Sequence, residues 1–146
     1  MFDDLAVLEP ENVDDGAASR ALLAHAVDVE DHVVAVGESA LDLGAGIRKF
    51  FGPHYIQHNP TAPDGIEGFK AFLGFLREKF PDSRSEIKRA LADGDYVILH
   101  VHSVREKGAR GRAIVDIFRL ENGKIVEHWD VAQEIPEKAA NTNGMF

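Results

Sequence analysis

The stretch that decides the fold is residues 115–133, VDIFRLENGKIVEHWDVAQ. Asn122-Gly123 at its centre is the dipeptide most typical of a tight β-hairpin turn, and both flanks are rich in the β-branched and aromatic residues that strands prefer. The second flank also contains His128 and Asp130, although aspartate is a poor strand former and a buried carboxylate is costly without a partner. The stretch therefore predicts two antiparallel strands that carry ionisable groups for a purpose other than strand formation.

More strands precede this hairpin and extend it into a sheet. Four segments have the composition of strands and are separated by glycine-containing turns: residues 85–92, 96–105, 112–120 and 124–133. A shorter strand is expected within HYIQHNP, residues 54–60. The C-terminal half is thus predicted to be an antiparallel meander.

Helices are expected in the N-terminal half. Residues 17–43 are rich in Ala, Leu and Val, and a short second helix is expected over residues 47–51. The clearest helix is residues 64–80, where Asp64 followed by Glu67 predicts a capping box and apolar residues recur at helical spacing. A helical half followed by a strand meander is an α+β arrangement.

Length and charge limit the kind of protein this can be. Residues 1–15 read as an acidic leader and residues 16–146 as a single domain. Residues 1–31 contain nine acidic residues and one arginine, and the rest of the chain is nearly neutral, with no basic stripe for a nucleic-acid backbone. No apolar run approaches the ~20 residues of a membrane span, and no secretory signal is apparent. The sequence therefore predicts a cytoplasmic protein that binds neither nucleic acid nor membrane, and the absence of cysteine excludes thiol chemistry.

The direction in which the two hairpin aspartates point depends on the turn between them. Alternation puts His128 and Asp130 on one face of their strand. A two-residue Asn-Gly loop would set Asp116 opposite Trp129 and leave the carboxylates on opposite faces. A three-residue loop with Gly123 in a bulge position would set Asp116 opposite His128 and bring the three ionisable groups to one face. Turn rules mildly favour the first loop and leave both open.

A shared site is favoured by the number of ionisable groups. Asp116 or Asp130 alone would be a weak signal, because a lone aspartate in a strand usually lies at an edge or an exposed end. Two aspartates and His128 in adjacent apolar strands are a stronger signal, since carboxyl groups brought together in an apolar site have their pKa values pushed apart. Such a pair supplies one group that takes a proton and one that donates it.

Several motifs resemble the SnoaL-like polyketide cyclases of the nuclear-transport-factor-2-like (NTF2-like) superfamily. They are YIQHNP at 55–60, GIEGFKAFLGFL in the clearest helix, the hairpin at 115–133 and the terminal NTNGMF, and the resemblance covers roughly residues 40–146. It implies a cone in which a curved, mostly antiparallel sheet wraps around N-terminal helices and encloses an apolar pocket, commonly in homodimers. It also favours the three-residue loop, since pocket residues must share a face.

The resemblance further implies an aldol condensation that needs neither cofactor nor metal. The acid/base aspartate of the family matches Asp130, whereas Asp116 stands where those enzymes have a histidine. Asp130 would remove a proton next to a carbonyl, and Asp116 or His128 would donate to the developing alkoxide. The residues expected to bind the small carbonyl substrate are His58, Asn59 and His102 at its oxygens and Tyr55, Phe72 and Phe118 as apolar wall.

A homodimer is also expected from the faces of the hairpin. Val115, Ile117, Trp129 and Val131 would form an apolar outer face that helices packed on the inner face cannot also cover.

Other readings stay open. His100 and His102 share a strand face and, with His58, Asp116 or His128, could bind zinc or iron. The protein could instead only bind an apolar ligand, or its pocket could act as a hydrolase or dehydratase on an epoxide or hydroxy ketone. Steroid-type isomerisation is disfavoured, because Asn59 stands where ketosteroid isomerase, another superfamily member, has its base aspartate.

Two surface motifs have no single functional interpretation. REKGARGR at 105–112 reads as a solvated hairpin tip, with the binding of an anionic substrate group as the less favoured reading. The end of the chain, AANTNGMF, reads either as a frayed tail or, because Met145-Phe146 is apolar, as a segment that covers the mouth of the pocket or a dimer seam.

Overall fold

The computed structural model describes residue 47 and residues 49–146, and its centre is a five-stranded mixed sheet. The strands lie in the order β1-β5-β4-β3-β2, with β1 parallel to β5 and the other neighbours antiparallel. The elements are β1 (Phe51–Gln57), α3 (Gly65–Lys79), β2 (Arg84–Asp93), β3 (Tyr96–Val104), β4 (Arg112–Glu121) and β5 (Lys124–Glu134).

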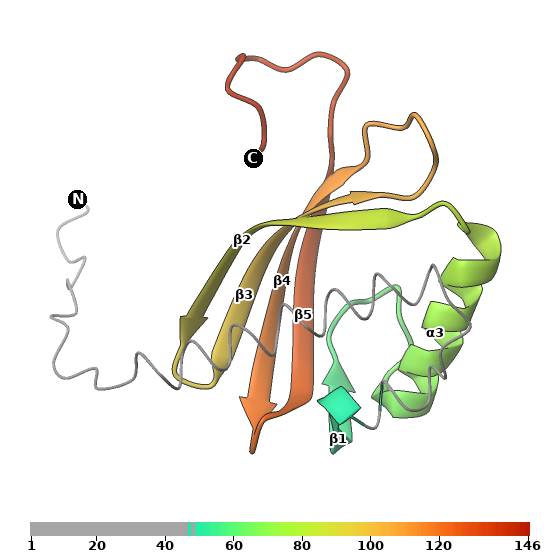
Figure 1. Cartoon of the computed structure of the whole chain (residues 1–146), viewed down its shortest axis with the longest axis vertical. Helices are drawn as coiled ribbons and strands as arrows, with labels where there is room; N and C mark the ends of the chain where they lie inside the picture. Colours follow the sequence, from blue (N-terminus) through green and yellow to red (C-terminus); the bar gives the residue numbers. More distant parts are fainter. Residues whose placement is uncertain (1–46, 48) are drawn as a thin grey trace, which may run out of the picture.

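The sheet is strongly curved. One end of β2 bends over toward the C-terminal end of α3, and α3 lies on the concave side of the sheet (Figure 1). The expected α+β cone is thereby confirmed. The acidic leader at 1–15 and the helical region at 17–43 lie outside the described residues, as does the boundary between leader and domain.

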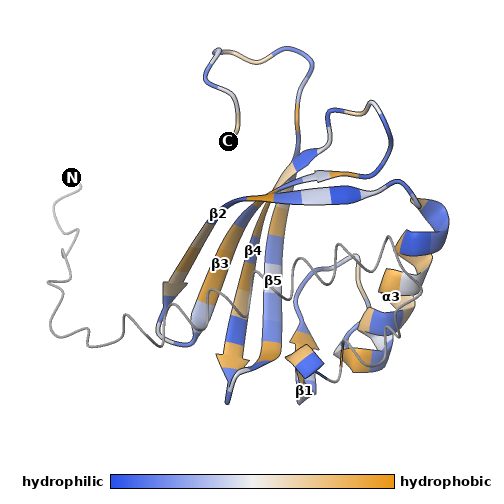
Figure 2. Ribbon diagram, in the orientation of Figure 1, coloured by the Kyte–Doolittle hydropathy of each residue, from blue (hydrophilic) through white to orange (hydrophobic). Residues whose placement is uncertain are grey.

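Apolar segments interrupted by polar residues run along the strands (Figure 2). The buried side chains between the two layers come from α3 and from the strands β1, β3, β4 and β5: Phe51, Tyr55, Phe69, Leu73, Val97, Leu99, Val101, Phe118, Leu120 and Ile125. Burying each large apolar side chain contributes about 1.5–3 kcal/mol. This core holds the concave face in shape around the site described below.

The start of β1 differs from expectation. The sequence predicts a helix through Phe51 and a strand from residue 54, whereas β1 already begins at Phe51 and contains Gly52 and Pro53. A Cβ atom at Gly52 would lie 2.8 Å from Val126 Cγ1, so glycine is required where β1 approaches β5. Pro53 is exposed on this edge strand, where a missing N–H is tolerated. Parallel pairing with β5 therefore overrides the Gly-Pro stop signal.

The helix α3 occupies the expected span, but its capping box is wrong. Asp64 is the N-cap residue without a side-chain cap; its Oδ1 instead accepts the backbone N–H of Gln57 at 2.8 Å. Glu67 accepts from Lys70 Nζ at 2.6 Å rather than reaching back to the cap. The Asp64 carboxylate thus ties the end of β1 to the start of α3.

The four expected strands are confirmed, but the expected three-residue hairpin loop is wrong. Asn122 and Gly123 have φ values of 52° and 71°, as a two-residue type I′ turn requires, and Glu121 pairs with Lys124. The register then shifts, because Val126 is an extra residue that no β4 residue opposes, which is a β-bulge. Beyond the bulge Asp116 pairs directly with Asp130.

The outer face of the sheet carries the expected apolar residues. Ile117 pairs with Trp129, and Val115 pairs with Val131. Val115 is 39% exposed and Val131 is 74% exposed. Within the part of the chain that the structure describes, no helix is long and apolar enough to cross a membrane.

Candidate active site

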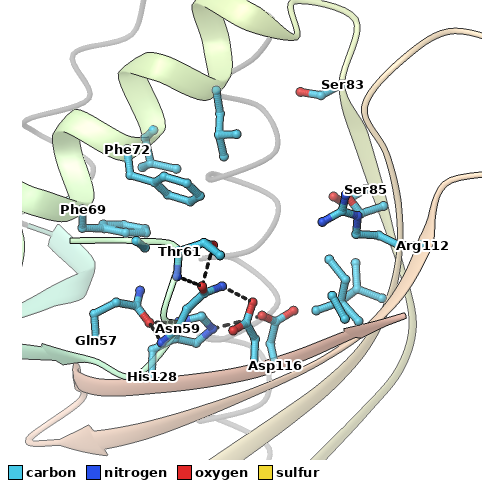
Figure 3. Close-up of a pocket in the computed structure, with 18 of the residues that line it drawn as sticks. Gln57, Asn59, Thr61, Phe69, Phe72, Ser83, Ser85, Arg112, Asp116 and His128 are labelled. Carbon is cyan, nitrogen blue, oxygen red and sulfur yellow. Dashed lines mark hydrogen bonds and ion pairs between the residues drawn. The ribbon is translucent and has the colours of Figure 1, made fainter. Parts of the chain in front are cut away.

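A cavity of about 550 Å³ lies between the concave face of the sheet and α3. Phe69 and Phe72 of α3 close one side of it (Figure 3), and Tyr55 of β1 and Phe118 of β4 also line it. Ligand pockets in proteins commonly measure about 300–1,000 Å³, so this cavity has room for a small organic molecule. Tyr55, Phe72 and Phe118 thus lie where the sequence expects the wall of a pocket.

The two aspartates meet in this cavity. Asp116 and Asp130 line it and are directly opposite in the β4–β5 register, where paired Cβ atoms are ~4.5–5.5 Å apart. Asp116 is buried and Asp130 is half-buried. Burial raises the pKa of the Asp116 carboxyl; His128 opposes this shift and the Asp130 charge adds to it. The two carboxyl groups therefore have different environments, as the sequence pattern predicts.

Asp130 is oriented by an amide rather than by a cation. Asn59 Nδ2 donates to Asp130 Oδ2 at 2.7 Å. The Asn59 amide is itself fixed, because its Oδ1 accepts the backbone N–H of Thr61 at 2.7 Å and the Thr61 hydroxyl at 2.6 Å. Among the described residues Asp130 has no ion pair, and its Oδ1 has no hydrogen-bond partner. Asn59, expected at a substrate oxygen, therefore holds Asp130 in place.

His128 has a hydrogen on Nδ1, which follows from its neighbours. Gln57 Oε1 accepts the backbone N–H of Asn59 at 2.9 Å, and Gln57 Nε2 donates to the Tyr55 hydroxyl at 2.8 Å, so the orientation of this amide is fixed. His128 Nδ1 lies 3.0 Å from the same Oε1. Because an amide oxygen only accepts, Nδ1 must be the donor.

The other nitrogen of His128 shares a proton with Asp116. Nε2 lies 3.0 Å from Asp116 Oδ1, and the two side chains lie side by side in Figure 3. A hydrogen bond there needs one hydrogen, so the pair is either imidazolium with carboxylate or neutral imidazole with carboxylic acid. Both forms have no net charge, which suits a buried position. The pair therefore stores one transferable proton beside Asp130.

Tyr55 is more than apolar wall. Burial raises the pKa of its phenol above the ordinary value, and the charges of Asp130 and Asp116 act in the same direction, so the O–H stays protonated. Its oxygen accepts from Gln57, and no described residue accepts its hydrogen. The hydroxyl is thus a hydrogen-bond donor available to a molecule in the cavity.

Two expected site residues are not in the cavity. The His58 ring stacks on Trp129 with centroids 4.6 Å apart, and its Nε2 contacts Glu127 Oε1 at 2.9 Å, on the outer face of the sheet. His102 is also on that face, where its Nε2 donates to the carbonyl oxygen of Arg110 at 2.8 Å. Their expected place at the substrate oxygens is corrected, because alternation turns both away from Asp116.

The alternative metal site does not assemble around the two strand histidines. His100 and His102 lie on the opposite face of the sheet from Asp116 and His128, and both contact the ring of Phe146, at 5.2 and 4.8 Å. Within residues 47 and 49–146 no three metal-binding side chains converge. Phe146 thus packs on the outer face, so its expected alternative place at the cavity mouth is wrong.

Gln57 and the donor role of Tyr55 were not predicted from the sequence. The signal was available in HYIQHNP, because alternation along a strand puts Tyr55, Gln57 and Asn59 on one face and His58 on the other. Arginine and serine side chains at the far end of the cavity were also missed, apart from the less favoured reading of residues 105–112.

A strongly curved sheet with a helix on its concave side and a cavity between them is the architecture of NTF2-like proteins. Within this class the chain belongs to the SnoaL-like domain family, whose sequence model matches residues 29–128. The match covers more than half of the chain and includes Asp116 and His128. Among curated proteins none matches the chain in sequence.

Solved structures with the same fold support this membership. A Jannaschia sp. CCS1 protein assigned as a SnoaL-like polyketide cyclase superposes with a TM-score of 0.66 at 19% identity, over 83% of this chain and 91% of that one. AclR of Streptomyces galilaeus, assigned as a hydroxylase, gives 0.62 at 23% identity, over 80% and 81%. A Bacillus cereus ATCC 10987 protein assigned as a polyketide cyclase gives 0.60 at 21% identity, over 74% of each chain. At these identities the likeness concerns the fold.

Proposed function

We propose that the protein is a cofactor-independent acid/base enzyme that acts on a small carbonyl substrate by an aldol condensation of the cyclase type. One observation carries the proposal: Asp130, half-buried and without a cationic partner among the described residues, lies opposite the buried Asp116–His128 pair in a cavity with aromatic walls. Two carboxyl groups in such different environments are suited to opposite roles, one as base and one as acid.

The first step is proton removal from carbon. Asp130 takes the proton from the carbon next to a carbonyl, and the electrons of the broken C–H bond form the enolate. Asn59 keeps Asp130 in position through the 2.7 Å hydrogen bond. The Tyr55 hydroxyl, which keeps its proton, can donate a hydrogen bond to the enolate oxygen.

The second step forms the carbon–carbon bond. The enolate carbon attacks a second carbonyl of the same molecule, and the resulting alkoxide takes the proton stored by Asp116 and His128. The proton on Asp130 then restores the pair, so the substrate is converted to an isomer with no net gain or loss of atoms. Both ring nitrogens of His128 are engaged by Gln57 and Asp116, which makes His128 a positioning residue for Asp116.

The activities assigned to the similar proteins are compatible with this chemistry and differ from one another. Polyketide cyclase is the assignment of the Jannaschia and Bacillus proteins, whereas AclR is assigned as a hydroxylase. Asp116 in place of a histidine means that the acid here is a carboxyl group backed by His128, so the substrate is expected to differ from those of the cyclases.

Deuterium exchange into 2-tetralone tests the proposed base, because this bicyclic ketone is small enough for the cavity and its benzylic hydrogens next to the carbonyl can be removed by a carboxylate; the rate without protein is subtracted. The unchanged protein should accelerate exchange at the carbon between the ring and the carbonyl, as followed by proton NMR in D₂O. Asp130→Asn should lower the enzymatic rate by about 10²–10⁴-fold, the usual contribution of a general base. His58→Gln, on the outer face, is the matched control and should keep the rate. Equal rates for Asp130→Asn and the unchanged protein would remove Asp130 from the mechanism.

We also propose that the outer face of the sheet is the interface of a homodimer. Val115 and Val131 are paired and exposed there, next to Ile117 and Trp129. Contiguous exposed apolar side chains on one face favour association, and a two-fold axis would cover both copies of the patch at once.

A further inference from the structure

We propose that the end of the cavity away from Asp130 binds a carboxylate, so that the substrate is an apolar keto acid whose carboxylate is several bonds from its reacting carbonyl. The position of that carbonyl rests on the proposed function, whereas the anion site has contacts of its own.

The site is a row of polar side chains across three strands. Ser85 of β2 pairs with Ser103 of β3, and Ser103 pairs with Arg112 of β4, so the three share the concave face. All three line the cavity, together with Ser83 and Arg105. Ser83, Ser85 and Arg112 gather at one end, away from Gln57 and His128 (Figure 3).

An apolar stretch separates this row from the acid/base pair. Arg112 and Asp116 are four residues apart on β4, or about 13 Å along the strand, and point to the same face. Between them Ile114 of β4 pairs with Val101 of β3, and both line the cavity. A molecule that reaches both ends therefore needs a polar reacting group, an apolar middle and a polar end.

Arg105 gives this end an excess of positive charge. Its guanidinium is half-buried, lies 5.2 Å from the centre of the Phe80 ring, and has no hydrogen bond or ion pair with the described residues. Burial lowers the pKa of Arg105, the neighbouring Arg112 adds to this, and the Glu134 carboxylate opposes it. Among the described residues Arg112 has only Glu134 as an ion-pair partner, at 2.8 Å, and that carboxylate is 72% exposed. A flat guanidinium held on an aromatic ring leaves its donor edge free for an anion.

A carboxylate suits the site better than a phosphate. The planar fork of arginine matches the two oxygens of a carboxylate, and the serine hydroxyls can donate to the same oxygens. The C-terminal end of α3 with Phe80 borders this end of the cavity, and a helix C-terminus carries partial negative charge. A single negative charge is therefore favoured over the double charge of a phosphate monoester.

Calorimetric titration with 4-benzoylbutyrate and its neutral amide tests the inference. The acid should bind at least about tenfold more tightly than the amide, because it gains a charge-assisted hydrogen bond. Arg105→Gln and Arg112→Gln should each remove most of this preference while leaving the amide unchanged. Arg89→Gln is the matched control: Arg89 is exposed on the outer face beside His100, so its loss should keep the preference.

Each other outcome counts against the inference. Equal binding of acid and amide, no binding of the acid, or a preference kept in both arginine variants would overturn it. Tighter binding of 3-phenylpropyl phosphate than of the acid would overturn the choice of carboxylate. If Arg105→Gln shows no cooperative unfolding transition by circular dichroism, Arg105→Lys is tested in its place. The lysine keeps the charge without the planar fork, so this variant should retain only part of the preference for the acid.

The two proposals fail separately. Asp130→Asn removes the proposed base without touching the arginines, so it should keep the preference for the acid. A preference for the acid without ketone exchange would support the anion site and contradict the proposed reaction. Ketone exchange without a preference for the acid would support the reaction and contradict the anion site.

Discussion

Replacing Asp130 with asparagine separates a carboxylate kept for chemistry from one kept for stability. In the structure Asp130 has no cationic partner among the described residues, and Asn59 Nδ2 donates to it at 2.7 Å. Asparagine can accept the same hydrogen bond, so the loss is that of charge assistance, about 1 kcal/mol. Removing a negative charge beside the buried Asp116 offsets a similar amount. The free energy of unfolding at neutral pH should therefore change by less than about 1 kcal/mol.

Thermal melts measure this prediction. For a domain of this size 1 kcal/mol corresponds to a shift of about 2–4 °C in Tm, so the Asn variant should melt within that interval of the unchanged protein. Asp130→Ala is the control; it leaves the Asn59 donor without its partner and should cost about 1–3 kcal/mol. A loss of about 3–5 kcal/mol in the Asn variant would refute the reasoning, because that is the cost of leaving a buried cation unpaired.

Three further predictions concern Asp116, the β1–β5 contact and the outer face. Folding raises the pKa of Asp116, so the protonated carboxyl stabilises the folded protein. This stabilisation is fully present below the pKa of an unfolded aspartate and is lost as the pH rises through the raised pKa. Asp116→Asn does not titrate, so its stability relative to the unchanged protein should increase with pH in urea melts from about pH 4 to pH 8; a constant difference would contradict this. Gly52→Ala should lose about 1–3 kcal/mol in thermal melts, since its Cβ would lie 2.8 Å from Val126 Cγ1, whereas Gly74→Ala in α3 meets no atom within 4 Å and should not destabilise. Light scattering should report twice the 16.0 kDa chain mass, and Val131→Glu should give the monomer. A monomeric unchanged protein would contradict the proposed homodimer.

The fold was predictable where local patterns agree with the tertiary structure. The Asn122-Gly123 turn and the period of the strands predict the meander, and the apolar period predicts α3. The start of β1 was not predictable, because Gly52 and Pro53 signal a stop locally and only the pairing with β5 turns them into strand. Long-range pairing of this kind leaves no trace in a short window of sequence.

The sequence predicted where Asp116, His128 and Asp130 lie, but not how the chain brings them together. Asp116, His128 and Asp130 line one cavity, but a bulge brings them together rather than a longer loop. No turn rule reports the bulge, because it depends on how Val126 packs against β1. The orientation of His102 could not be predicted either, since alternation determines which residues share a face of the sheet but not which face lies inward.

Because Val126 has no partner on β4, β5 could lose one residue there and still keep the pairing of Asp130 with Asp116. A relative with one residue fewer between Lys124 and Asp130 would form a regular ladder from the same turn and still have its carboxylates opposite each other. A relative with one residue more would need a second bulge, or its aspartate would face away from the cavity. Deletions in this strand should therefore be tolerated better than insertions. A sequence alignment without a gap at Val126 would pair Asp130 with a residue of the wrong face.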